Sequence, residues 1–166
     1  MAQEKSCGKC NLCCKLMIIP ELEKPDNVWC THCEIGKGCR IYDTRPQMCR
    51  EFNCRYITDP TLGGEWHPAR AHFVLRASGN ILILQVDPQR PEAFKRAPYH
   101  AALRKHAATV YPKGGQIIAK IADRAIAILP DRDIDLGLCD ESDRVKTTQQ
   151  FTPQGIRWNV EKVPGR

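Results

Sequence analysis

The second part of the chain has a hydrophobic pattern that predicts a small α+β domain. Short apolar runs rich in β-branched residues predict four strands, at residues 71–78, 81–87, 116–122 and 125–130. A turn at Gly79-Asn80 joins the first two strands into a hairpin, because glycine tolerates positive φ. Residues 92–111 have the apolar spacing of a helix, with a kink or restart at Pro98. The order strand, strand, helix, strand, strand predicts a small antiparallel sheet with the helix on one face.

Two stretches outside this pattern carry local signals. Thr44 and Gln47 form a T-x-x-Q capping box, which predicts a short helix over residues 45–53. The acidic residues of PDRDIDLG (130–137) alternate along the chain, but this stretch lacks the glycine and the distal glutamate of an EF-hand. We therefore interpret 130–137 as a polar loop.

The end of the chain is polar, and this composition predicts less regular structure there. Residues 139–150 read as an exposed loop, and GIRWNVEKV (155–163) as an edge strand, with partial disorder as the alternative. We expect three segments in all: a cysteine-rich metal-binding module with short helices, the small α+β domain and a polar tail, over residues 1–58, 59–138 and 139–166.

Cysteines dominate the first segment. Nine of the ten lie between residues 7 and 54, with the spacing C-x2-C-x2-C-C, fifteen residues, then C-x2-C-x5-C-x9-C-x4-C. Disulfides, metal binding and redox catalysis all use closely spaced cysteines. An odd number of cysteines would leave one thiol unpaired, and the start of the chain has no apolar segment of signal-peptide length. We therefore favour metal binding over disulfides.

The first four cysteines fit metal binding when residues 7–14 are taken as about two helical turns. Cys7, Cys10 and Cys14 then fall within about 60° of arc, and Cys13 lies about 60° further round. Such an arc presents three sulfurs to one ion and a fourth to a second ion. Eight thiolates fill two closed tetrahedral zinc sites.

Three stretches, CGKCNLCC, WCTHC and GCRIYDTRPQMCREFNC, together resemble the YkgJ-like cysteine-cluster family of zinc- or iron-chelating CxxCxxCC proteins. The resemblance covers residues 7–54, and the stretches EWHPARAHFVL, VDPQRPEAFKRAPYH and ILPDRDIDLG resemble one subgroup of the family. It implies eight metal ligands: Cys7, Cys10, Cys13, Cys14, Cys30, Cys39, Cys49 and Cys54. Cys33 departs from the family pattern, since an apolar residue is more usual there. We favour a packing role for Cys33, with a ninth ligand as the alternative.

Zinc and iron–sulfur clusters both use thiolate-only sites. The start C-x2-C-x2-C resembles a bacterial ferredoxin run, but Cys14 follows Cys13 directly and no C-x3-C-P continuation is present. We therefore expect two zinc ions, with iron or an iron–sulfur cluster as the alternative. The scattered histidines His67, His72, His100 and His106 are assigned to the surface or to packing.

Several functional classes remain open. The sequence has no nucleophile–base set, P-loop or dinucleotide loop, which favours a metal-binding protein without catalytic activity. An iron–sulfur redox or enzyme-accessory protein is the first alternative, and a zinc-stabilised nucleic-acid-binding protein is the second. Eight thiolates with two divalent cations add a charge of −4, which lowers the formal net charge from +6 to about +2 and weakens the case for nucleic acid.

The expected location is the cytoplasm. The sequence has no apolar run of the roughly 20 residues that span a membrane, and it has no recognisable signal peptide. Cytoplasmic thiols stay reduced and so remain available to metals. No membrane partner is expected, and the sequence identifies no protein partner.

Overall fold

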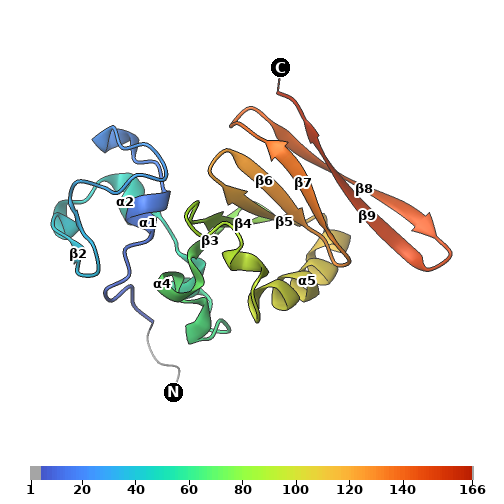
Figure 1. The fold of residues 1–166 in the computed structure, drawn as a ribbon, viewed down its shortest axis with the longest axis horizontal. Helices are drawn as coiled ribbons and strands as arrows, with labels where there is room; N and C mark the ends of the chain where they lie inside the picture. The colour runs from blue at the N-terminus through green and yellow to red at the C-terminus, as the bar shows by residue number, and fades with distance from the viewer. Residues whose placement is uncertain (1–4, 166) are drawn as a thin grey trace. The chain divides into compact units, whose positions relative to one another are not determined.

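The computed structural model describes residues 5–165, and the chain is a mixed α+β protein. Its elements before the larger sheet are α1 (Cys13–Leu16), η1 (Pro20–Leu22), β1 (Cys33–Glu34), β2 (Gly38–Cys39), η2 (Tyr42–Thr44), α2 (Gln47–Glu51), α3 (Arg55–Thr58), η3 (Gly64–Trp66) and α4 (Pro68–Ala71). The remaining elements are β3 (Phe73–Ser78), β4 (Ile81–Val86), η4 (Ala93–Lys95), α5 (Tyr99–Val110), η5 (Tyr111–Lys113), β5 (Gln116–Ile121), β6 (Arg124–Ile128), β7 (Asp133–Leu138), β8 (Arg144–Thr152) and β9 (Gly155–Val163). Figure 1 shows these elements along the chain.

The chain forms two compact units. The first contains the described residues up to Arg76 together with Gln85–Phe94, and the second contains Ala77–Leu84 and the residues from Lys95 onward. The first unit therefore holds all the cysteines of residues 7–54. The hairpin of β3 and β4 belongs partly to each unit.

Five strands build the larger sheet, of which β5, β6 and β7 lie wholly in the second unit. The sheet order is β3-β4-β5-β6-β7, and the pairs β5–β6 and β6–β7 are antiparallel. Helix α5 packs against β5 and β6 and buries Leu103 and Ala107 (Figure 1). Ile117 and Ile128 are fully buried in the facing strands. At the turn before β4, Gly79 has a φ of 58°, as the Gly-Asn turn requires.

Strand β7 corrects the prediction of a polar loop at 130–137. The alternating aspartates lie on a strand because each finds a basic partner. Asp133 is bonded to His100, with Oδ2 and Nε2 2.8 Å apart, and Asp135 accepts hydrogen bonds from the Arg124 guanidinium on the neighbouring strand. The hydrogen bond from Asp133 to His100 and the ion pairs of Asp133 with Arg104 and of Asp135 with Arg124 compensate for the acidic side chains of this strand.

The tail is more regular than the polar composition predicts. Strand β9 occupies the residues predicted as a strand, but it pairs with β8, which the sequence analysis read largely as a loop. The two strands form an antiparallel ribbon in which Arg144 lies opposite Val163 and Thr152 lies opposite Gly155 (Figure 1). Polar side chains mask the strand signal because the ribbon is largely exposed and needs no apolar face.

Short elements make up the first unit, and two predicted helices are corrected there. The helical turns predicted over 7–14 are wrong: Gly8 has a left-handed φ of 50°, and the helix begins only at Cys13. The capping box is also wrong, because Arg45 before Pro46 is extended and no side chain caps α2. Helix α2 consequently starts at Gln47, and it still carries Cys49.

None of the helices within residues 5–165 has the length and apolar character needed to cross a lipid bilayer.

Candidate metal centre

Backbone hydrogen bonds bring the separate cysteine segments together. The Cys30 N–H donates to the Cys14 carbonyl (3.0 Å), and the Cys33 N–H donates to the Cys30 carbonyl (3.0 Å). Cys33 and Cys39 are direct partners across the small β1–β2 hairpin. All ten cysteines are free thiols. The fold therefore collects distant cysteines without any disulfide among the described residues.

Helix α1 is fixed by a buried ion pair. Lys15 Nζ lies 2.8 Å from Asp87 Oδ1 and donates to Gln89 Oε1 at 2.9 Å, and the residues Lys15 and Asp87 are each less than a tenth exposed. This pair ties the helix that begins with Cys13 and Cys14 to the segment after β4. Leu16, on the same helix, packs with Leu12 and Val74. The helix that carries Cys13 and Cys14 is thus anchored by the Lys15–Asp87 pair and by the packing of Leu16.

We call Cys7, Cys10 and Cys54 the first thiol set. Cys10 and Cys54 pack against the apolar cluster of Leu12, Leu16 and Val74. The three thiols line a hollow of about 20 Å³, which is room for about one water-sized guest. Burial raises the pKa of each thiol, and neighbouring thiols raise it further, Cys10 acting on Cys7 and Cys7 acting on Cys54. The set is therefore protonated in the absence of a cation.

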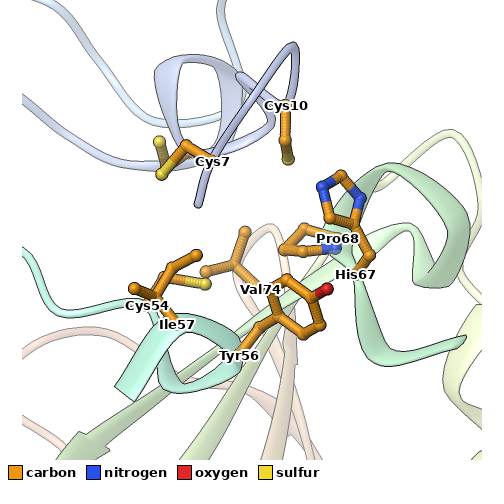
Figure 2. Close-up of a pocket in the computed structure, with 9 residues that line it drawn as sticks. Cys7, Cys10, Cys54, Tyr56, Ile57, His67, Pro68 and Val74 are labelled. Carbon is orange, nitrogen blue, oxygen red and sulfur yellow. The ribbon is translucent and has the colours of Figure 1, made fainter. Parts of the chain in front are cut away.

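Other side chains complete the walls of this hollow. Cys13, Tyr56, Ile57, His67, Pro68 and Val74 line it together with the first thiol set. Figure 2 shows the side chains of Cys7, Cys10, Cys54 and His67 around the hollow. The His67 ring stands edge-on to Tyr56, with ring centroids 5.1 Å apart and an interplanar angle of 82°. The lining thus combines sulfur and nitrogen donors with apolar surface.

A second thiol set consists of Cys14, Cys30, Cys33, Cys39 and Cys49. Burial and the nearby thiols of Cys14, Cys30 and Cys39 raise the pKa of Cys33 to about 12. The same causes raise the pKa of Cys49. The Cys14 thiol interacts with Cys13 and Cys33, and its pKa is raised first by the Cys13 thiol and then by burial. Electrostatic coupling thus links these five thiols, and Cys14 also raises the pKa of Cys7 and Cys10 in the first set.

Lys24 supplies a buried positive charge beside the second thiol set. The residue is 6% exposed, and its Nζ donates to the carbonyls of Lys15 (3.1 Å), Met17 (2.5 Å) and Pro25 (2.8 Å). Burial lowers the pKa of the ammonium, and the Cys30 and Cys14 thiolates act in the opposite direction. Lys24 therefore satisfies carbonyls around α1 and places a positive charge where Cys30 and Cys14 would carry negative charge as thiolates.

Replacing Lys24 by methionine is expected to destabilise the first unit. The three carbonyls would lose their donor, and a buried polar group left unpaired costs about 1–3 kcal/mol. Lys37→Met is the matched control, since Lys37 makes only an exposed ion pair with Glu34, which contributes little. Urea denaturation would compare the two variants. Equal free energies of unfolding would show that Lys24 has no such role.

The donor chemistry of these residues fits a thiophilic cation, although the donors are not gathered around a common point. Among residues 5–165, no group of three or more histidine, cysteine, aspartate or glutamate side chains lies in an arrangement able to hold a metal ion. Binding would require thiol side chains to rotate toward a shared centre. A bound cation would favour thiolates over thiols, and the raised pKa values of thiols such as Cys7, Cys33 and Cys49 mean that binding would release protons and weaken as the pH falls.

The eight cysteines suggested as ligands all lie in the first unit, and they divide between the two sets with Cys13 at the boundary. Cys33 lies within the second set, although the sequence analysis favoured a packing role.

The sequence analysis did not single out two residues that lie beside the thiols. In the sequence, Lys24 resembles a surface charge between Glu23 and Pro25, and His67 resembles a scattered histidine. No local pattern identifies either of them.

Comparison with known proteins adds nothing to this picture: no protein-family model, no curated protein and no solved structure matches the chain.

Proposed function

We propose that this protein binds two metal ions, zinc in the first instance, through the cysteines of its first unit, and that it does so without catalysing a reaction. The observation that supports this proposal most strongly is the crowding of nine thiols from separate segments. Burial and neighbouring thiols raise the pKa of six of them, and Lys24 is the buried cation beside them; the six are Cys7, Cys10, Cys14, Cys33, Cys49 and Cys54. A divalent cation relieves this repulsion and is bound by thiolate sulfur.

The two thiol sets divide the ligands of the two ions. Cys7, Cys10 and Cys54 serve one ion, and the second set serves the other, with Cys13 next to both. Zinc would supply a cross-link between segments that are far apart in the sequence, since a closed thiolate site contributes folding free energy directly. The role is structural or one of metal storage, and it requires a reducing compartment such as the cytoplasm.

The proposal predicts about two metal ions per chain, because a closed zinc site takes four ligands. Protein purified under anaerobic conditions would be measured by elemental analysis and by its visible absorption spectrum. Colourless protein with about two zinc ions agrees with the proposal. Brown protein containing iron and sulfide would replace zinc with the iron–sulfur alternative, and protein without bound metal would contradict metal binding altogether.

A further inference from the structure

Only part of the β8–β9 ribbon is covered by the rest of the second unit. Near the open end of the ribbon, Val160 is buried and Trp158 packs against Tyr111, with ring centroids 6.0 Å apart. Toward the turn the ribbon is bare: within residues 148–157, every residue except Thr152 is exposed. Figure 1 shows the ribbon as a long two-stranded hairpin. The half of the hairpin that carries the turn therefore presents both of its faces to solvent.

The pairing register sorts the side chains of the ribbon onto two faces. Residues directly opposite each other in an antiparallel pair lie on the same face, and successive residues alternate between the faces. The face that carries Trp158 and Val160 is the covered one. The opposite face carries three cross-strand pairs of exposed residues, which we call the outer row: Lys146–Glu161, Thr148–Asn159 and Gln150–Arg157.

The two cations of the outer row are only weakly neutralised. Residues 144–160 contain no aspartate or glutamate. Lys146 Nζ lies 3.9 Å from Glu161 Oε1, and Arg157 Nε lies 3.9 Å from Asp131 Oδ2. All four side chains are more than half exposed, and exposed ion pairs of this length contribute little free energy. Lys146 and Arg157 can therefore exchange these carboxylates for the phosphates of an anionic partner.

The uncharged members of the outer row suit the edges of nucleic-acid bases. The side-chain amides of Gln150 and Asn159 each combine donors with an acceptor, which matches the edge of adenine, and the Thr148 hydroxyl can bond to any base. Asn159 Oδ1 accepts only a long hydrogen bond, 3.5 Å, from Arg132. A lipid surface would leave such amides without partners, which is unfavourable. The outer row therefore fits a polar, anionic partner better than a membrane.

We propose that the outer row enters the major groove of double-stranded DNA. This groove is about 12 Å wide and admits a two-stranded β-ribbon. Thr148, Gln150 and Asn159 face the base edges, while Lys146 and Arg157 contact phosphates. The inference goes beyond metal binding, and the two are independent, because the ribbon belongs to the second unit and the clustered cysteines to the first.

Fluorescence anisotropy of a labelled DNA duplex of mixed sequence, titrated with the full chain over a series of salt concentrations, tests the proposal. The association constant should fall as the salt concentration rises. The double variant Lys146→Gln/Arg157→Gln should bind more weakly, and the slope of the logarithm of its association constant against the logarithm of salt concentration should be shallower by about 2. Absence of binding to the duplex at low salt would overturn the proposal.

Lys105→Gln/Lys113→Gln is the matched control, since it removes the same charge from two exposed lysines of α5 and η5, outside the ribbon. The control should keep the slope of the unsubstituted protein. Equal changes in the two double variants would show diffuse attraction to phosphate and would overturn the assignment to the outer row. Equal affinity for duplex RNA would also contradict it, because side chains cannot read the deep, narrow major groove of A-form RNA.

Discussion

Treatment with a strong chelator will unfold residues 7–54 and leave α5 with strands β5–β7 folded. The first segment has little regular structure to keep it folded: α1 has four residues, α2 has five and each strand of the β1–β2 hairpin has two. Isolated helices this short are unstable in water. Structural zinc contributes about 10–16 kcal/mol in small zinc-binding peptides at neutral pH, which exceeds the total stability of many domains.

Hydrogen exchange measured by mass spectrometry resolves the two regions. After chelation, amides from residues 7–54 should exchange within the shortest measurable time, while those of α5 and β5 should keep their protection. Adding zinc back should restore the original protection and serves as the control. Equal protection of residues 7–54 with and without the chelator would show that metal does not support this part of the fold.

Replacement of Cys14 by serine is expected to have the largest effect of any single cysteine substitution. Cys14 interacts with Cys13 and Cys33, acts on Cys7, Cys10 and Cys49, and accepts the Cys30 N–H through its carbonyl. Losing its sulfur should empty the second site and disturb the first. We expect the metal content to fall from about two ions per chain to one or fewer, because Cys14 acts on thiols of both sets.

Cys139→Ser is the matched control for this substitution. Cys139 lies in the second unit and belongs to neither thiol set. The control should retain its metal and its thermal stability, which would be measured beside the metal content of Cys14→Ser. Two ions retained in Cys14→Ser, or equal losses in both variants, would contradict the central place of Cys14.

The sequence predicted the regular part of the fold because its signals are strong there. Residues 73–86 and 116–128 are apolar and β-branched, and the strands form where these runs lie. Strand β7 escaped prediction because its acidic side chains are satisfied by partners distant in sequence, as Asp133 is by His100. Tertiary partners of this kind leave no local pattern. Strand β8 escaped prediction because it lies in a largely exposed ribbon that needs no apolar face.

Prediction of the candidate site from the sequence was limited in the same way. Cysteine spacing led to the sulfur donors that we propose, but it placed Cys7 and Cys10 on a helix that Gly8 prevents. The cysteine spacing also could not divide the nine thiols into sets. That division depends on how helix α1 packs relative to the β1–β2 hairpin. Lys24 and His67 became visible only through burial and through the walls of the hollow.

X-ray absorption at the metal edge of the native protein tests the central claim most directly, because it reports which atoms surround the ion. Binding by the cysteines predicts a first shell dominated by sulfur at about 2.3 Å. A first shell made only of oxygen and nitrogen at about 2.0–2.2 Å would contradict the claim that these thiols hold the metal.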